Sequence, residues 1–278
     1  RSREDLEKVR SHCTAAGKNP KLMAKIERRE ALVSLDEIIQ SSDGVMVARG
    51  DLGVEIPVEQ VPMAQKRIIA LANQKGKAVI TATQMLESMV QHPWPTRAEV
   101  TDVANAVLDG TDGVMLSQET SIGLHPLEAI QIMDRVSREV EDQVQPVDAA
   151  ERRDEPSEDV SEAVVHGACH IADEIEARLI VAMTRTGRTA QRFSAARPKM
   201  PIVALVPDEE TARMLVMHRG VVPLLAEHME ALERQPETII NLIKTAGLAQ
   251  PGDRIILTGG LPSGKAGATR FAKVLNIT

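Results

Sequence analysis

Charged and hydroxyl side chains follow four short apolar runs in the first half of the chain. The runs cover residues 22–26, 45–48, 78–82 and 114–116. If these runs are parallel strands, their carboxyl ends meet at one edge, where working residues of such sheets gather. The candidate site residues at these ends are Lys25, Glu27, Gly50, Asp51, Thr83, Ser117 and Glu119.

The residue types at this edge favour chemistry on a phosphate group. Lys25 and Glu27 lie two residues apart, so in a strand both side chains leave on the same face. Glu27 and Asp51 offer the hard oxygen ligands that suit Mg²⁺, which often takes only one or two protein carboxylates. Lys25 would then face the same phosphate, and Gly50 would let a ligand approach the backbone. An ordinary salt bridge at a strand end is the alternative.

The elements that position these residues alternate strand and helix. Each apolar run is followed by polar residues and then by a helical pattern, which predicts a parallel sheet covered by helices. An Asp-Gly-Val-Met sequence occurs at 43–46 and again at 112–115. This repeat indicates either a repeated strand–helix unit or a coincidence. Thr96 and Glu99 form a capping-box pattern, which predicts a helix that ends near Gly110.

A second α/β domain is predicted after an acidic stretch. Residues 139–159 contain nine acids and two arginines, together with prolines, which is typical of a helix end followed by a linker. The predicted division is a first domain at 1–140, a linker at 141–158 and a second domain at 159–278. In the second domain we expect strands at 179–183, 202–206, 221–225 and 255–257 and helices at 159–176, 189–196, 208–217 and 236–249.

The composition excludes several classes of protein. The chain has 278 residues, 43% apolar and 26% charged, which is typical of a folded globular protein of about two domains. A net charge of −7 with three aromatic residues argues against a nucleic-acid partner, and no apolar run approaches the ~20 residues that span a bilayer. Two cysteines, Cys13 and Cys169, make no disulfide framework, and with no signal-like opening we expect a cytoplasmic protein.

A second candidate site follows the strand predicted at 179–183. Backbone amides at a helix N-terminus favour anions and two arginines can bind phosphate oxygens, although a capped turn with solvent-facing arginines has the same pattern. The residues are Thr184, Arg185, Thr186, Gly187, Arg188 and Thr189.

Two further patterns in this domain resemble known sites less well. Gly259 and Gly264-Lys265 have the spacing of a phosphate-binding P-loop, but Pro262 and Ala266 remove an amide and the metal-binding hydroxyl, which argues against that motif. His166, Cys169 and His170 share one helix face and could hold zinc. The alanines and valines around them favour a helix packed on a sheet instead.

Several segments together resemble the pyruvate kinase family in order and spacing. They are Lys-Ile-Glu at 25–27, Met-Val-Ala-Arg-Gly-Asp-Leu-Gly at 46–53, Ala-Thr-Gln-Met-Leu-Glu-Ser at 82–88, Pro-Thr-Arg-Ala-Glu at 95–99 and Asp-Val-Ala-Asn-Ala at 102–106. The resemblance covers the entire chain. It implies an α/β fold in which residues 1 to about 140 form the second half of a (β/α)8 TIM barrel, about four βα units, followed by an open, mostly parallel α/β effector domain.

The resemblance also implies a reaction, the glycolytic transfer of a phosphoryl group from phosphoenolpyruvate to ADP. By motif position, Glu27 and Asp51 hold Mg²⁺ or Mn²⁺, Lys25 neutralises the phosphoryl charge, and the Gly50 and Asp51 amides with Thr83 receive the substrate carboxylate. Thr83, Ser117 and Glu119 correspond to the polar network beside the enolate.

Further implications concern effectors, subunits and potassium. A phosphorylated sugar effector is expected at 184–189 together with a second loop that contains Ser263, Gly264, Lys265 and Gly267. Arg97 corresponds to an arginine that lies near a neighbouring subunit's site, which implies a homotetramer. The family also uses K⁺, whose ligands precede the residues present here.

Two departures from the family pattern leave other functions open. Gln118 stands where the family usually has glycine, and half of the barrel, the lid domain and the substrate arginine precede Arg1. We therefore expect a fragment that is inactive alone and whose half barrel leaves sheet edges unpaired. The alternative is a noncatalytic sugar-phosphate-binding regulatory protein derived from pyruvate kinase, and a third is a structural oligomerisation module.

Overall fold

The computed structural model of the chain describes residues 1–143, 159–226, 235–260 and 269–278. The chain divides into two compact units, Arg1–Gln145 and Pro146–Thr278. The predicted linker at 141–158 lies, from residue 144 onward, outside the described residues. Within the described ranges, no helix combines the length and the apolar character needed to cross a membrane.

Unit 1 is built on a four-stranded parallel sheet with the strand order β1-β2-β3-β4, here called sheet A. This confirms the strands predicted from the apolar runs to within one residue. Sequential strands are neighbours and run the same way, so each connection must cross over the sheet through helical segments. The strands are β1 (Met23–Ile26), β2 (Gly44–Ala48), β3 (Ala78–Ala82) and β4 (Gly113–Met115).

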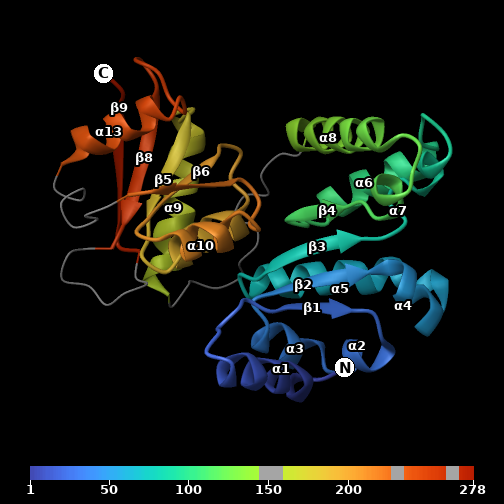
Figure 1. The fold of residues 1–278 in the computed structure, drawn as a ribbon. Helices are drawn as coiled ribbons and strands as arrows, with labels where there is room; N and C mark the ends of the chain where they lie inside the picture. The colour runs from blue at the N-terminus through green and yellow to red at the C-terminus, as the bar shows by residue number, and fades with distance from the viewer. Residues whose placement is uncertain (144–158, 227–234, 261–268) are drawn as a thin grey trace. The chain divides into compact units, whose positions relative to one another are not determined.

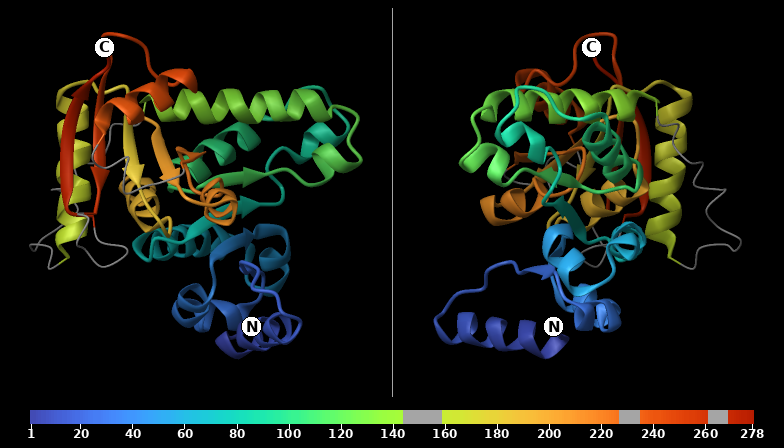
Figure 2. Two further views of the ribbon diagram at one scale, coloured as in Figure 1. Left: turned by 60° about the vertical axis from the view of Figure 1, so that its left-hand side comes forward. Right: turned by 90° about the vertical axis from the view of Figure 1, so that its right-hand side faces the viewer.

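Helices cover one face of sheet A. In α3 and α5, Ile38, Ile39, Ile68 and Ile69 pack with the strand residues Val45, Val47 and Val79 in one buried cluster. Figures 1 and 2 show the long helix α8 running alongside α6, which it contacts. The helical segments are α1 (Arg3–Ala15), α2 (Arg29–Val33), α3 (Leu35–Ser41), α4 (Arg49–Glu55), η1 (Val58–Gln60), α5 (Val61–Gln74), η2 (Glu87–Val90), α6 (Arg97–Leu108), α7 (Gln118–Ser121) and α8 (Pro126–Gln143).

The predicted capping box at the start of α6 is present. Thr96 Oγ1 accepts a hydrogen bond from the Glu99 amide at 3.2 Å, and the Glu99 carboxylate accepts one from the Thr96 amide at 2.7 Å. The same carboxylate also binds the amide and the hydroxyl of Ser88, at 2.7 and 2.5 Å. Glu99 therefore both caps α6 and fastens the segment that follows β3.

The repeated Asp-Gly-Val-Met sequence has the same structural role twice. The Asp43 carboxylate accepts a hydrogen bond from the Leu22 amide at 2.7 Å, and the Asp43 amide donates to the Leu22 carbonyl at 2.8 Å. Asp112 makes the same two bonds with Val79, at 2.8 and 2.9 Å. Each aspartate thus bonds the amide and carbonyl of one residue in the preceding strand segment. The repeat marks two equivalent strand pairs.

The other face of sheet A is less covered. The cross-strand neighbours Lys25, Met46, Ile80 and Gly113 form one row on that face. None of the four is fully buried, whereas the flanking Val45, Val47 and Val79 are. Parallel sheets normally have both faces covered. The side chains of this row are therefore available for contacts other than core packing.

Unit 2 contains a five-stranded sheet with the order β7-β6-β5-β8-β9, here called sheet B. The four strands predicted in this domain are present and mutually parallel, and β9, an edge strand that pairs antiparallel with β8, was not predicted. The fold class is thereby confirmed as α/β, with one parallel sheet and one mostly parallel sheet. The strands are β5 (Leu179–Met183), β6 (Ile202–Val206), β7 (Val221–Leu225), β8 (Arg254–Gly259) and β9 (Phe271–Asn276).

Helices pack on both faces of sheet B, so β5 and β6 are buried along their whole length. On one face α9, α10 and α11 contribute Ala168, Phe193 and Leu215 to the core, and on the other α13 contributes Ile239 and Ile243. The helices begin and end close to their predicted positions. They are α9 (Val160–Glu174), α10 (Arg188–Ala196), α11 (Glu209–Leu215) and α13 (Pro236–Thr245).

Candidate functional site

The candidate residues of unit 1 gather at the carboxyl ends of the strands of sheet A. The arrowheads of β1, β2 and β3 point the same way in Figure 1, and α4 begins directly at the end of β2. Lys25 belongs to β1, Glu27 follows it, Asp51 lies in the first turn of α4, and Thr83 follows β3. We call this edge the carboxyl rim.

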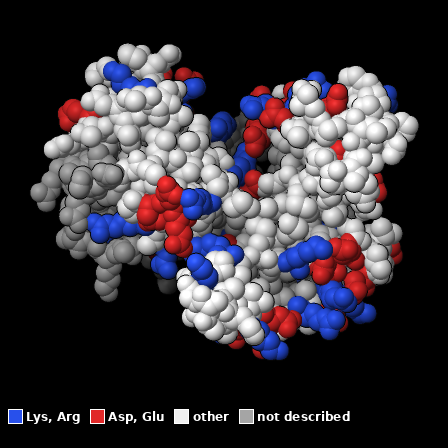
Figure 3. All heavy atoms as spheres, viewed as in Figure 1, with Lys and Arg blue, Asp and Glu red and all other residues white. Residues whose placement is uncertain are grey.

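Lys25 binds both carboxylates of the rim. Its Nζ lies 2.6 Å from Glu27 Oε2 and 2.7 Å from Asp51 Oδ2, and all three side chains remain partly exposed. The hydrogen bonds to Asp51 and Glu27 raise the pKa of Lys25, and the bond from Lys25 lowers the pKa of Asp51. Figure 3 shows basic and acidic side chains side by side around β1, α2 and α4. At this exposure the ion pairs add little to stability.

The pair of carboxylates fits a divalent cation. Glu27 and Asp51 each place one carboxylate oxygen against the same Lys25 ammonium, so the two carboxylates lie close together. Among the residues that the structure describes, no three His, Cys, Asp or Glu side chains cluster as a metal site would. Two carboxylates with access to water match Mg²⁺, which completes its shell with water and substrate phosphate.

Thr83 joins the rim through the backbone of α4. Its Oγ1 accepts a hydrogen bond from the Gly50 amide at 2.7 Å and donates to the Ala82 carbonyl at 2.6 Å. Thr83 and Gln84 both have left-handed backbone conformations, with φ of +70° and +54°. A left-handed backbone conformation in a residue other than glycine costs on the order of 1–3 kcal/mol. Such strain occurs more often at functional sites than elsewhere.

Packing does not explain the glycines of α4. A Cβ added at Gly50 would come no closer than 3.4 Å to Thr83, and one at Gly53 no closer than 3.8 Å to Val61, which are ordinary contacts. Glycine inside a helix is destabilising by roughly 0.5–1 kcal/mol relative to alanine. The fold has room for a methyl group at both positions, so access of a ligand to the α4 backbone stays a prediction from the sequence.

Ser117 and Glu119 lie after β4, and Glu119 contacts the segment after β3. The buried Glu119 carboxylate accepts hydrogen bonds from the Leu86 amide at 3.1 Å and the Ser117 amide at 2.8 Å. In this structure it therefore holds two backbone segments together. Gln118 is exposed and is not among the left-handed residues, so its backbone conformation does not demand the family's usual glycine.

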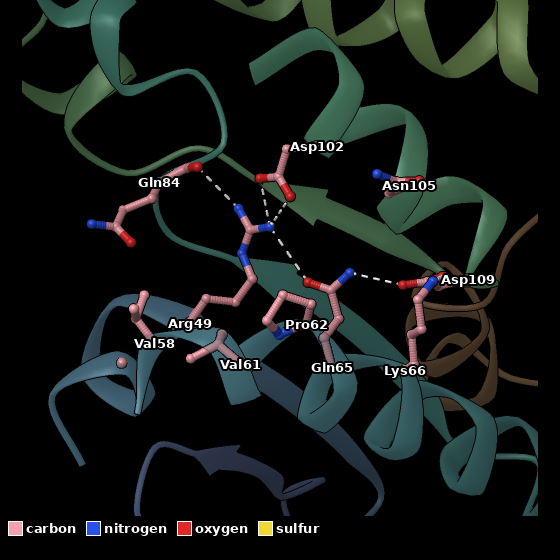
Figure 4. Close-up of a pocket in the computed structure, with 11 residues that line it drawn as sticks. Arg49, Val58, Val61, Pro62, Gln65, Lys66, Gln84, Asp102, Asn105 and Asp109 are labelled. Atoms are coloured by element: carbon pink, nitrogen blue, oxygen red, sulfur yellow. Dashed lines mark hydrogen bonds and ion pairs between the residues drawn. The ribbon is translucent and has the colours of Figure 1, made fainter. Parts of the chain in front are cut away.

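Arg49 is a residue of the carboxyl rim for which no role was predicted from the sequence. Its guanidinium is 9% exposed and binds the carbonyl oxygens of Thr83 and Gln84. It also pairs with Asp102 at 2.6 Å and lines a pocket of about 350 Å³ between α4, α5 and α6. Figure 4 shows the Gln84 carbonyl facing Arg49 while the Gln84 side chain points away. Its partners are mostly backbone carbonyls, which leave no signal in a sequence.

The second candidate site is the loop between β5 and α10. Arg185, Thr186 and Arg188 are exposed, whereas Thr184 and Thr189 are buried. Gly187 has φ of +80°, and a Cβ there would lie 2.6 Å from the end of the Met214 side chain, so a larger residue would be strained and would displace Met214. The exposed arginines at the start of a nine-residue helix form a surface suited to anions.

The other predicted effector loop begins and ends beside sheet B. Ser263, Gly264, Lys265 and Gly267 lie outside the described residues. The Arg270 amide donates to the Gly259 carbonyl at 2.8 Å, which joins the two ends of this loop. Thr269 Oγ1 lies 3.0 Å from Thr189 Oγ1, so Thr269 contacts the first turn of α10.

The His166, Cys169 and His170 pattern fits core packing better than a zinc site. Cys169 packs against the core of sheet B, and burial raises the pKa of its thiol to about 12, which disfavours the thiolate that binds zinc. His170 is exposed, and His166 Nε2 lies 3.9 Å from Glu162 Oε1.

Arg97, the predicted interface residue of unit 1, is exposed at the first position of α6.

Known proteins match the chain in both of its units. Residues 1–130 match the family model "Pyruvate kinase, barrel domain", and residues 162–275 match "Pyruvate kinase, alpha/beta domain". The chain is 44% identical to a pyruvate kinase of Thermotoga maritima over 277 residues, which cover 100% of this chain and 59% of that protein. It is 42% identical to one of Clostridium acetobutylicum over 259 residues, 93% of this chain and 55% of that protein.

A eukaryotic relative gives the same result. A pyruvate kinase of Eimeria tenella is 45% identical over 277 residues, 99% of this chain and 52% of that protein. The chain thus spans between half and three fifths of the length of these relatives. With matches to both the barrel model and the alpha/beta model, and whole-chain identity to several enzymes of one name, the chain belongs to the pyruvate kinase family.

Proposed function

We propose that the protein containing these residues transfers a phosphoryl group from phosphoenolpyruvate to ADP and so produces pyruvate and ATP. The observation that carries this proposal is the contact of Lys25 with both Glu27 and Asp51 at the carboxyl rim of a parallel sheet. Because the chain spans only part of its relatives, the activity is proposed for the longer protein, and we expect the 278 residues alone to be inactive.

Positioned positive charge is the main contribution of these residues. Phosphoryl transfer asks little covalent chemistry of the protein, so electrostatic stabilisation of the transferring group supplies most of the rate enhancement. Lys25 donates to the phosphoryl oxygens, and Glu27 and Asp51 hold Mg²⁺ or Mn²⁺. The bound cation would neutralise phosphate charge. K⁺ dependence is a further expectation from family membership.

The opposite side of the rim orients the substrate. The Gly50 and Asp51 amides lie in the first turn of α4, where backbone N–H groups lack helical partners and favour a carboxylate. In the structure the Gly50 amide donates to Thr83 Oγ1, and the Thr83 hydroxyl donates to the Ala82 carbonyl. On binding, the substrate carboxylate would replace Thr83 Oγ1 as the acceptor of the Gly50 amide, and the Thr83 hydroxyl would turn from Ala82 toward the substrate. Removal of the phosphoryl group leaves an enolate that needs a proton, and we assign that side of the site to Thr83, Ser117 and Glu119.

A coupled lactate dehydrogenase assay on the full-length protein tests this function. We expect Lys25→Met and Asp51→Asn each to lower kcat/KM for phosphoenolpyruvate by at least about 100-fold, the usual cost of a lost electrostatic group. Lys75→Met and Asp36→Asn are matched controls, because these residues form a separate surface ion pair at 2.9 Å. Wild-type turnover in both rim variants would remove these residues from the chemistry, and a wild-type protein without turnover would favour the noncatalytic regulatory alternative.

We further propose that residues 184–189 bind the phosphate of a phosphorylated sugar effector, together with the loop at 261–268. The exposed Arg185 and Arg188 at the start of α10, and the contact between Thr189 and Thr269, support this proposal. Calorimetry should detect binding of fructose 1,6-bisphosphate, ribose 5-phosphate or glucose 6-phosphate, which Arg188→Ala abolishes. Arg254→Ala, at the opposite end of sheet B, is the control, and unchanged heats in Arg188→Ala would reject this site.

The proposed assembly is a homotetramer. Arg97 is exposed on α6, and the exposed apolar side chains Val54, Val58 and Met63 lie on the consecutive elements α4, η1 and α5. Exposed apolar surface of this kind is typical of a subunit contact. Analytical ultracentrifugation of the full-length protein, with Arg97→Glu as the variant, measures the oligomeric state directly.

A further inference from the structure

The turn after β3 is the one place in the described chain where two consecutive residues other than glycine are left-handed. The other such residues, Glu176 and Arg197, occur singly. Threonine is β-branched, and its Cβ makes this conformation unfavourable, so surrounding contacts must hold it. The turn follows a buried strand and lies beside the first turn of α4.

Arg49 supplies these contacts. Its Nε and Nη2 donate to the Thr83 carbonyl at 3.2 and 2.8 Å, and Nη2 also donates to the Gln84 carbonyl at 3.0 Å. Both carbonyls of the left-handed pair are therefore bound by one planar group. Lysine has no planar fork and cannot reproduce this pattern.

The guanidinium is itself held in place from the other side. Its Nη1 binds Asp102 at 2.6 Å and Gln65 Oε1 at 3.4 Å. Gln65 in turn donates to Asp109 at 2.9 Å, and Lys66 also pairs with Asp109. Figure 4 shows this chain of contacts from α6 and α5 to the turn. Arg49 thus ties the turn after β3 to two helices.

The turn determines where the Thr83 hydroxyl lies. In the left-handed conformation Oγ1 is 2.7 Å from the Gly50 amide, the group to which we assign the substrate carboxylate. We propose that Arg49 is a positioning residue for phosphoryl transfer, which holds the Thr83–Gln84 turn so that Thr83 and the Gly50 amide face the phosphoenolpyruvate carboxylate together. This inference rests on the proposed function, but its backbone consequence can be measured without turnover.

Arg49→Lys in the full-length protein tests the inference. We expect kcat/KM for phosphoenolpyruvate to fall about 100-fold, the size of effect that misplacement of a site by about 1 Å produces, with KM for ADP changed less than about twofold. Arg67→Lys, an exposed arginine on α5, is the matched control. An Arg49→Lys enzyme with unchanged kcat/KM would overturn the inference.

A double-mutant cycle separates positioning from general stability. If Arg49 acts through Thr83, Arg49→Lys should have much less effect in a Thr83→Ala background than in the wild type. Fully additive losses, with KM for ADP rising equally, would show a structural role only and overturn the proposal. Asp102→Asn leaves Arg49 in place but loosens its anchor, so a smaller loss in the same direction is expected even if Arg49→Lys folds poorly.

Hydrogen exchange makes the two proposals independently testable. The Gly50 amide donates to Thr83 Oγ1, so Arg49→Lys should increase its exchange rate at least about tenfold when measured by mass spectrometry of peptides that contain Gly50. Retained protection overturns the inference. Lost protection in Arg49→Lys of a protein whose wild type shows no turnover would show that Arg49 holds the turn, while rejecting the proposed function.

Discussion

The two candidate sites use a left-handed turn in different ways. After β5 the turn contains Gly187, whose φ of +80° has no steric cost for glycine. After β3 the turn consists of Thr83 and Gln84, whose carbonyl oxygens both accept hydrogen bonds from the Arg49 guanidinium. A glycine turn supplies only backbone, whereas the threonine turn also supplies a hydroxyl. A side chain that is supplied from a left-handed position thus comes with hydrogen bonds from a second residue to the strained backbone.

The anchoring charges differ as well. The segment after β3 is fixed by Arg49 and by the Glu99 carboxylate, which binds the Ser88 amide at 2.7 Å. The loop region of unit 2 is fixed by neutral groups, since Thr189 contacts Thr269 and the Thr269 amide donates to Ser161 Oγ at 3.1 Å. We therefore expect acid to loosen the first site and leave these bonds of the second intact.

Replacing Gly187 in the turn after β5 should give the largest effect on the free energy of unfolding. Gly187→Ala should lower the free energy of unfolding by about 2 kcal/mol, because a left-handed alanine costs roughly 1–2 kcal/mol and its Cβ would also displace the Met214 side chain. Urea unfolding measures the change. Gly220→Ala is the control with φ of +72° and no atom within 4 Å of the added Cβ, so it should cost less. Equal losses would show that the contact with Met214 is unimportant.

Replacing Gln84 by glycine in the turn after β3 should stabilise the protein slightly. Gln84→Gly relieves the left-handed glutamine, a gain partly offset by a more flexible unfolded chain, so we expect a net increase of about 0.5–1 kcal/mol in the free energy of unfolding. The Gln131→Gly control, in the interior of α8, should instead lose about 1 kcal/mol. A loss in Gln84→Gly would mean that its side chain has a structural role.

The smallest expected effect is the response to pH. Burial alone raises the pKa of Glu99, but hydrogen bonds from Ser88 and Thr96 outweigh it, so the pKa is lowered overall. The stabilisation is therefore complete above the unfolded pKa, about 4.3, and is lost as the pH falls through the folded value. The free energy of opening at the Ser88 amide, from hydrogen exchange corrected for intrinsic rates, should fall in acid. That of Thr269 should not, and Glu99→Gln should remove the difference.

The sequence predicted the fold of both units well because buried parallel strands are continuous apolar runs. The strands at 78–82, 179–183, 202–206 and 221–225 have the bounds expected from the residues alone. β9 was missed because it is an edge strand in which Lys273 interrupts the pattern and only Leu275 is buried. Its position depends on pairing with β8, a long-range contact that local pattern does not encode.

The candidate site was predictable to the extent that it depends on strand alternation. The spacing of Lys25 and Glu27 placed both side chains on one face, and the structure brings them to 2.6 Å. Arg49 was not assigned a role, because its acceptors are the carbonyls of residues 83 and 84, which any residue type carries. A left-handed threonine is equally hidden from sequence patterns, since glycine is the residue expected there.

The aspartates of the repeated Asp-Gly-Val-Met sequence lie at the amino ends of β2 and β4, opposite the carboxyl rim. They fasten the strand pairs β1–β2 and β3–β4 at the edge of the sheet that takes no part in the proposed chemistry. Strand alignment and reactivity are thereby assigned to different ends of one sheet. A designer could exchange the side chains at positions 25, 27 and 83 for those of another reaction and expect the strands to keep their register.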